Sequence, residues 1–421
     1  TWSGGTNTIN DGGTVQDTHW DVSGGTNTVE GGTTGGTLHV QSGGTGFEFT
    51  GTGAPTITLN SDNATAGRIL LEGDMIVAAG YTGSGATITS AAGGSNPGFI
   101  DLNGATRNFI INDSASAAND LSISAIITSA GGLDKSGAGT LLLSGVNTYT
   151  GNTTISAGTL EIGGAGQLGS GTYAGTISNS GTLDYNSSAD QTLSGIISGT
   201  GDLEVNGAGT LTLSADNTYT GTTDINAGTL LINGDNSLAN GALNILSDAT
   251  LGGIGTIGGA TTLNSGGFLS PGDGGTGDTI TFLSSLDISN ASTGSLLFDL
   301  GAPGTSDLVA MATGAELTIA SLSVADFIFT NLGSAAEGDY TLFTTANTAI
   351  VGIGSLNTTM NLISLSPSGP QFNARLSTGD FGIDGGQFIA LTLSAVPEPS
   401  SITLLGLGLS ALLLRRKRSA A

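Results

Sequence analysis

Few residues in this chain of 421 could do acid–base or metal chemistry. Its only histidines are His19 and His39, and a histidine pair can bind a metal ion or move a proton near neutral pH. Their spacing equals the offset between the two copies of a short repeat, Ser3–Ile9 and Ser23–Val29. We therefore expect stacked structural positions in adjacent repeats rather than a metal site.

Catalysis has little support among the other side chains. Enzymes that cleave glycosides pair two carboxylates, or use a Lys or Arg base, yet the acids here are dispersed and Lys135 is the only lysine before the C-terminal tail. There is no cysteine and no Gly-rich phosphate loop followed by lysine. We predict a protein that is not an enzyme, with no catalytic residue, metal site or cofactor. Weak binding of divalent cations by the acidic surface stays an open alternative.

Two other features could bind ligands but have simpler structural interpretations. Gly274–Ile280 is similar to a calcium-binding nonapeptide, but it lacks one residue before Asp278 and occurs once, where such sites need stacked copies. We expect a turn there. Trp2 and Trp20 could stack on glycans, although we expect buried or end-capping roles.

The composition indicates a folded, acidic β protein. Gly numbers 73 and Pro 8, and 8 basic residues stand against 33 acidic ones, for a net charge of −25. The segment from Pro397 carries one acid and four bases, so the preceding residues carry −28. That charge repels phosphate backbones, and we therefore exclude nucleic acid as a partner.

Internal repeats predict the architecture. Gly131–Leu168 and Gly201–Leu238 align with each other without a gap. Within each copy, strands of three to five residues alternate apolar and small polar positions, and Gly- or Asn-containing turns separate them. Such short strands suit a parallel β-helix, in which each pairs with its equivalent one rung away. At about 20–25 residues a rung, one unit is about three rungs.

The repeat also resembles a known family. The pattern GAGTLxLSxxNTYTGxTxIxAGTLxI, present in both copies, resembles the autotransporter-associated β-strand repeat, also called the passenger-associated transport repeat. The resemblance implies a right-handed β-helix in a secreted or surface-displayed protein. The fold class expected is thus all-β, a right-handed parallel β-helix.

The end of the chain combines three segments in a fixed order. Val396-Pro397-Glu398-Pro399 precede an uncharged apolar run, Ile402–Leu414, and a basic cluster, Arg415–Arg418. Thirteen residues reach about 20 Å as a helix, short of a bilayer core of about 30 Å, so a buried or interfacial helix is the alternative. The run is apolar on every face, however, and its terminal cations can snorkel on the cytoplasmic side. We predict a single C-terminal hydrophobic helix in the membrane.

This tail resembles the PEP-CTERM sorting signal. The resemblance implies a recognition motif followed by a membrane segment and a basic stop, handled by a membrane-embedded exosortase in bacteria that make extracellular polysaccharide. The motif residues are Val396, Pro397, Glu398 and Pro399; the membrane residues are Ile402, Leu404, Leu405, Leu407, Leu409, Leu412, Leu413 and Leu414; and the stop is Arg415, Arg416, Lys417 and Arg418.

Four regions follow. We expect Gly/Thr-rich solenoid rungs at 1–118, a β-helix with the two repeats (120–168 and 190–238) at 119–270, a C-terminal β cap or small β domain at 271–394, and the sorting and membrane segment at 395–421. Because the sequence starts Thr1-Trp2-Ser3, we expect either a removed signal peptide or a fragment.

The function expected is that of an exported, non-catalytic rod. It would pass through the inner membrane, reach the cell surface or extracellular matrix, and associate with polysaccharide there as an adhesin-like scaffold. The alternatives are a β-helix lyase or glycoside hydrolase and an inert structural stalk.

Overall fold

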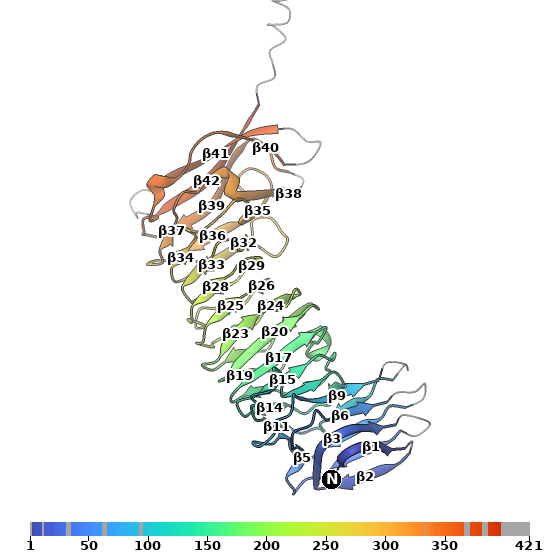
Figure 1. Cartoon of the computed structure of the whole chain (residues 1–421). Helices are drawn as coiled ribbons and strands as arrows, with labels where there is room; N and C mark the ends of the chain where they lie inside the picture. Colours follow the sequence, from blue (N-terminus) through green and yellow to red (C-terminus); the bar gives the residue numbers. More distant parts are fainter. Residues whose placement is uncertain are drawn as a thin grey trace, which may run out of the picture.

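The computed structural model describes residues 2–10, 12–30, 35–60, 65–91, 96–332, 334–365, 371–380 and 386–396 (Figure 1). Within these ranges the chain is built of β-strands and turns, and its helical elements are three single-turn 3-10 helices: η1 (Gly169–Gly171), η2 (Val324–Asp326) and η3 (Ile353–Ser355). The all-β prediction is confirmed.

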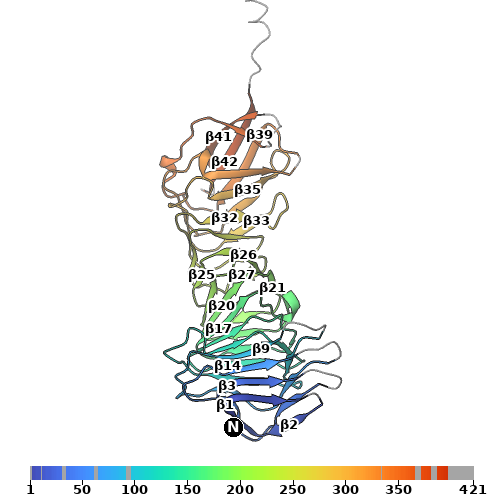
Figure 2. The ribbon, with the colours of Figure 1, turned by 45° about the vertical axis from the view of Figure 1, so that its right-hand side comes forward.

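The strands coil into a long rod with three faces, seen from two sides in Figure 1 and Figure 2. The chain visits the faces in the same order on each turn, and every pairing between the described strands up to β39 is parallel. β3 is long enough to continue around the corner from the first face to the second, and β1 runs beside it. The parallel solenoid expected from the sequence is therefore the observed architecture.

The bounds of the strands follow the three faces. The first face contains β1 (Trp2–Ile9), β3 (His19–Val29), β5 (Gly46–Phe49), β8 (Met75–Val77), β11 (Arg107–Ile111), β14 (Leu133–Ser136), β16 (Thr153–Ile155), β19 (Ile177–Asn179), β22 (Ile197–Ser198), β27 (Asp235–Asn236), β30 (Thr256–Ile257), β33 (Thr279–Phe282), β36 (Leu308–Met311) and β39 (Gly338–Thr345). The second face adds β6 (Thr56–Leu59), β9 (Ala86–Ser90), β12 (Leu121–Ile123), β15 (Thr140–Leu143), β17 (Thr159–Gly164), β20 (Thr182–Ser187), β23 (Asp202–Val205), β25 (Thr223–Ile225), β28 (Leu243–Ile245), β31 (Thr261–Leu263), β34 (Leu286–Asp287) and β37 (Leu317–Thr318). The third face contains β2 (Thr14–Asp17), β4 (Thr37–Val40), β7 (Arg68–Leu71), β10 (Phe99–Asp101), β13 (Ile126–Thr128), β18 (Thr172–Tyr173), β21 (Gln191–Leu193), β24 (Thr210–Leu213), β26 (Gly228–Ile232), β29 (Ala249–Gly253), β32 (Phe268–Pro271), β35 (Leu296–Leu300) and β38 (Phe327–Asn331).

The core is a set of apolar columns inside the coil. Inward residues of successive strands lie directly over one another because the pairing is in register, and alternation sends every second side chain inward. One column on the second face, with every member at most 2% exposed, consists of Leu121, Leu141, Leu160, Leu183 and Leu203. Like residues stack on like, so each rung buries the apolar surface of the rung before it.

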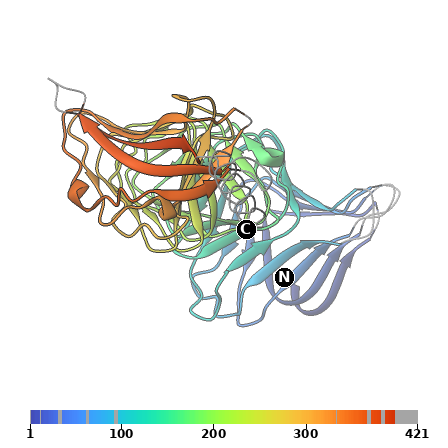
Figure 3. The ribbon, with the colours of Figure 1, turned by 90° about the horizontal axis from the view of Figure 1, so that it is seen from above.

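Rung length changes along the rod. Near the N-terminus Val22 pairs with Phe49, whereas further along Leu121 pairs with Leu141, so one turn takes more of the chain in the first case than in the second. The N-terminal rungs accordingly form wider loops, visible in the view from above in Figure 3.

The two sequence repeats lie on different faces of the rod. β14 and β16 of the first copy belong to the first face, whereas their counterparts in the second copy, β23 and β25, belong to the second. Likewise β15 is on the second face and its counterpart β24 is on the third. One repeat unit of the chain therefore makes three full turns and then passes one more of the three faces. This is slightly more than the three rungs or so that we expected from the sequence.

The tyrosine of each Asn-Thr-Tyr-Thr-Gly segment pairs with a buried threonine that follows the segment. The Tyr149 hydroxyl lies 2.9 Å from Thr153 Oγ1, and in the second copy Tyr219 lies 2.8 Å from Thr223 Oγ1. All four residues are at most 3% exposed. The members of each pair satisfy each other, which avoids the cost of about 1–3 kcal/mol of an unpaired buried hydroxyl.

The asparagine at the start of each of these segments accepts a backbone N–H of the neighbouring rung, where a paired strand would offer a backbone carbonyl. Asn147 Oδ1 accepts the backbone N–H of Ile127 at 2.9 Å, and Asn217 Oδ1 accepts that of Ile197 at 2.7 Å. Through these and further backbone bonds, residues 147–150 and 217–220 continue the third and first faces although they form no strand.

A glycine turn recurs at the same place in both copies. Gly158 and Gly228 have φ values of 65° and 63°, in the left-handed region that glycine adopts most readily. A Cβ at either would also stand 2.5 Å or less from a backbone carbonyl of the neighbouring rung, Gly137 or Gly207. These positions need glycine for conformation and for close approach.

Antiparallel strands complete the C-terminal end. Parallel rungs continue beyond residue 271, where the sequence repeats fade, as far as β39. β39 then pairs antiparallel with β42 (Gln387–Ala395), and β42 with β41 (Gln371–Asp380), which pairs with β40 (Asn361–Ser364). These strands cover the hydrogen-bonding edge that β39, the last parallel strand of the first face, would otherwise leave open.

Lys135 is the one lysine among the described residues, and it occupies an inward position. It is 0% exposed and pairs in register with Phe109 and Ile155. Its ammonium donates to three backbone carbonyls, the nearest that of Gly137 at 2.8 Å. Burial lowers the pKa of Lys135 to about 8, and Asp120 partly opposes that shift.

This buried lysine predicts that the protein becomes more stable as the pH rises from about 7.5 to about 9.5. In that range unfolded lysine still holds its proton while folded Lys135 loses it, so the free energy of unfolding should increase by on the order of 1 kcal/mol. The variant Lys135→Met, which cannot titrate, should lack this increase. Urea unfolding at each pH measures both proteins, and an identical pH dependence would contradict the assignment.

Candidate functional surfaces

The predicted sorting and membrane segments lie almost entirely outside the described residues. Val396 is the last residue described; it follows β42 directly and is 37% exposed. Pro397, Glu398 and Pro399, the apolar run Ile402–Leu414 and the basic cluster Arg415–Arg418 are not described. In the part of the chain that is, we find no helix with the length and apolarity to cross a bilayer.

The prediction that the two histidines stack on each other is wrong. His19 is in β3 on the first face and pairs with Gly46, whereas His39 is in β4 on the third face and pairs with Leu70. Their spacing misled because a rung is longer there than the short repeat. His39 Nε2 instead lies 3.2 Å from Glu72 Oε2, an ion pair only when the histidine is protonated.

The tryptophans and the glycine-rich segment have the structural roles expected. Trp20 is 6% exposed and meets Trp2 edge to face at 5.4 Å, at the N-terminal end of the core. Within Gly274–Ile280 the chain bends back, and Asp278 Oδ2 accepts the backbone N–H of Gly275 at 3.2 Å. Across the described residues, no three His, Asp or Glu side chains converge in a way that could hold a metal ion.

Acidic residues that are dispersed in the sequence form one column on the second face. The pairing places Glu161 beside Asp184, Asp184 beside Glu204 and Glu204 beside Asp224. These four residues, here called the acidic ladder, point outward from β17, β20, β23 and β25. Neighbouring strands are about 4.8 Å apart, so the carboxylates follow one another at about that interval.

Asparagine side chains bind the acidic ladder. Asn206 Nδ2 donates to Asp184 Oδ1 at 2.8 Å and to Glu204 Oε2 at 3.2 Å. Asn186 donates to Glu161 in the same way, at 2.9 Å. The amides hold the carboxylates in place and leave further lone pairs for a ligand or for water.

The ladder ends in a shallow hollow of about 540 Å³. Asn244 continues the column from Asp224 and donates to its Oδ1 at 2.7 Å. The hollow is lined by Asp224, Asn226, Asn244, Leu246, Ser247 and Asn264. Amides and a carboxylate at its wall suit a hydroxylated ligand.

Like charges within the ladder act on its most enclosed member. Burial raises the pKa of Asp184 to about 6; the bond from Asn206 lowers it, and the charges of Glu161 and Glu204 raise it further. Protonation of Asp184 therefore reduces repulsion within the ladder in mildly acidic solution.

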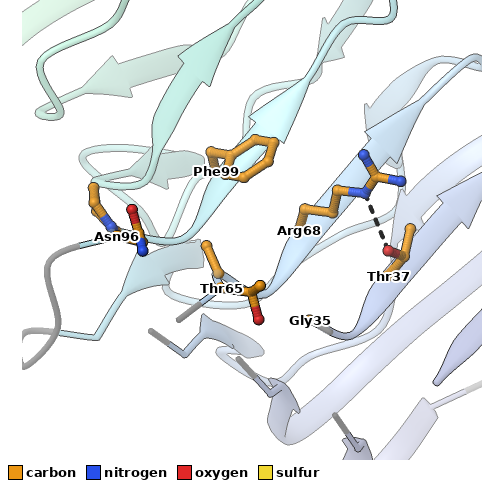
Figure 4. A pocket seen from close by; sticks show the side chains of 8 residues that line it. Gly35, Thr37, Thr65, Arg68, Asn96 and Phe99 are labelled. Carbon is orange, nitrogen blue, oxygen red and sulfur yellow. Dashed lines mark hydrogen bonds between the residues drawn. The ribbon is translucent and has the colours of Figure 1, made fainter. Parts of the chain in front are cut away.

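A second hollow lies on the third face, at the corner that follows the second face (Figure 4). Its volume is about 500 Å³. Arg68 of β7 and Phe99 of β10 line it, side by side in register. Sequence reasoning missed both residues: one is a scattered base and the other one of thirteen phenylalanines, and only rung register brings them together.

Comparisons with known proteins confirm the two motifs. The Passenger-associated-transport-repeat family matches residues 133–162 and 203–232, from β14 to β17 and from β23 to β26. The PEP-CTERM protein-sorting motif matches residues 395–418. The chain thus contains two passenger-associated transport repeats and one PEP-CTERM motif, and the motif implies exosortase processing and membrane anchoring.

A protein named as an adhesin also shares sequence with this chain. Over 129 residues it is 37% identical to the "Adhesin BmaC autotransporter" of Brucella suis biovar 1 (strain 1330), an alignment that covers 27% of this chain and 4% of that protein. With the PEP-CTERM motif, this similarity indicates an exported, cell-surface protein.

The acidic ladder predicts a stabilising substitution. The raised pKa of Asp184 means that its contribution to stability is full below about pH 4 and is lost as the pH rises through about 6. Asp184→Asn keeps the acceptor for Asn206 and should raise the free energy of unfolding at about pH 7.5 by about 1 kcal/mol, with no gain at about pH 4. Asp224→Asn, one strand beyond Glu204 in the column, is the matched control and should change less. Equal effects of both near neutral pH, measured by urea unfolding, would contradict the assignment.

Proposed function

We propose that this chain, with its two passenger-associated transport repeats and its PEP-CTERM motif, is a non-catalytic, adhesin-like scaffold of the cell surface or extracellular matrix. The rod sets a distance from the membrane, and its polar faces bind extracellular polysaccharide. The tail directs sorting: exosortase recognises Pro397–Pro399 while Ile402–Leu414 lies in the inner membrane and Arg415–Arg418 stays on the cytoplasmic side.

The observation that carries this proposal is the rod itself. Each turn adds one outward position to every column, and many of these positions are polar, so weak contacts recur along the length at about 4.8 Å. A polysaccharide also repeats along its length, and many weak contacts made together raise avidity by several orders of magnitude. The acidic ladder adds a second mode, in which divalent cations bridge its carboxylates to acidic sugars.

The relative supports the adhesive role. That protein is named as an adhesin, and this chain is a repeat-containing rod that exposes side chains on three faces. The proposal is one of binding, and it assigns no nucleophile or catalytic base among the described side chains.

The sorting step can be tested by changing the recognition residues. Replacing Pro397, Glu398 and Pro399 with alanine should leave the protein in the inner membrane, because exosortase would no longer engage it. Ser400→Ala with Ser401→Ala is the matched control and should be released normally. Cell fractionation measures release, and mass spectrometry of the released protein should find a C-terminus before Ile402. Unchanged release of the alanine variant would refute the sorting assignment.

The binding step can be tested with the purified protein and matrix polysaccharide. We expect co-sedimentation that calcium increases by several-fold, since the cation bridges like charges. A variant with Glu204→Gln and Asp224→Asn should lose most of the calcium-dependent part. If the wild-type protein binds none of the polysaccharide with or without calcium, the rod is an inert stalk and the adhesive function is wrong.

A further inference from the structure

The hollow on the third face, here called the corner pocket, combines a cation, an aromatic ring and polar groups. It is lined by Gly35, Thr37, Thr65, Ala66, Arg68, Asn96, Pro97 and Phe99. These residues come from three consecutive rungs, each contributing the chain that leads into β4, β7 or β10. Its volume of about 500 Å³ lies within the range of about 300–1,000 Å³ of sites that bind small molecules.

The guanidinium of Arg68 is fixed through its Nε, whereas its two terminal nitrogens remain available to a ligand. It pairs in register with Thr37, and its Nε donates to Thr37 Oγ1 at 3.1 Å (Figure 4). Among the described residues this is the partner of its guanidinium, so Nη1 and Nη2 keep donors for a ligand. A guanidinium fixed in this way presents a planar fork that matches the two oxygens of a carboxylate.

Two other cations of the rod are committed to the fold. Arg107 donates to the backbone carbonyls of Leu102 and Glu72, and Lys135 is enclosed in the core. Arg68 by contrast lines a hollow on a molecule of strongly negative charge.

Phe99 supplies an apolar surface next to that cation. Phe99 pairs directly with Arg68, so the two side chains leave adjacent strands on the outer side of the sheet about 4.8 Å apart. The inward neighbours Ile69 and Ile100 are fully buried, whereas Phe99 is only partly covered. The face of an aromatic ring attracts the C–H groups of a sugar ring, because its π-system carries negative charge density.

We propose that the corner pocket binds a carboxylated sugar unit of an acidic polysaccharide. The sugar ring lies on Phe99, and its carboxylate receives hydrogen bonds from Arg68. Because Arg68 and Phe99 stand in register on adjacent strands, one sugar unit contacts both side chains. This inference rests on the polysaccharide association proposed above and names the class of sugar and the site.

The experiment is a calorimetric titration of the full-length protein with tetragalacturonate and with its methyl ester. EDTA is present throughout, so that calcium bridging at the acidic ladder does not contribute. The acid should bind at least tenfold more tightly than the ester, because the ester has lost the charge that Arg68 pairs with. The ester should retain weak binding, since its ring can still lie on Phe99.

Variants separate the cation from the ring. Arg68→Gln should weaken binding of the acid at least tenfold and leave the ester unchanged, whereas Phe99→Leu should weaken both. Arg375→Gln makes the same charge change at an exposed position of β41, outside the pocket, and should leave both affinities within twofold. Arg68→Lys keeps the charge but loses the fork and should lie between wild type and Arg68→Gln. Circular dichroism melts confirm that each variant is folded.

The outcomes distinguish the pocket from the wider function. Equal binding of acid and ester, or wild-type affinity in Arg68→Gln, overturns the proposed pocket. If the pocket fails in this way while matrix polysaccharide still co-sediments with the protein, the adhesive function stands and another face carries it. If tetragalacturonate binds through Arg68 but no matrix polysaccharide co-sediments, the pocket stands and the adhesive function fails.

Discussion

Parallel pairing of each rung with the next, residue over residue, is the constraint on which the rest of this structure depends. It fixes which side chains enter the core, since a shift of one residue would send each apolar column outward. It also fixes which polar side chains become neighbours on the surface. Leu121 to Leu203 inside and Glu161 to Asp224 outside follow from the same register on the same face.

Because surface columns are assembled by register, they do not follow the sequence repeats. The acidic ladder takes Glu161 from the first copy, Asp184 from the segment between copies, and Glu204 and Asp224 from the second copy. Equivalent strands of the two copies face different sides of the rod. Both copies therefore share the hydrogen bonds of the buried tyrosines and asparagines that stabilise the rungs. The outward residues of the two copies, in contrast, contribute to different faces.

Polar groups inside the rod are tolerated where they are paired. Tyr149 and Tyr219 satisfy a threonine each, and Lys135 donates to three carbonyls. The ends of the coil use other devices: Trp2 and Trp20 at the N-terminal end, and the antiparallel β40–β42 at the other. A rod built in this way has no need of cysteine, since contacts between adjacent rungs stabilise it throughout its length.

The all-β coil, the two repeats and the sorting tail could be predicted from the residues alone, because alternation, turn glycines and the order of motif, apolar run and cations are local properties of the chain. The sequence did not show which residues share a surface. The spacing of His19 and His39 misled because rung length varies, and the neighbours Arg68 and Phe99 belong to separate rungs, far apart in the chain. Those contacts follow from the three-dimensional fold, since each depends on the length of every intervening loop and thus on how much of the chain makes one turn.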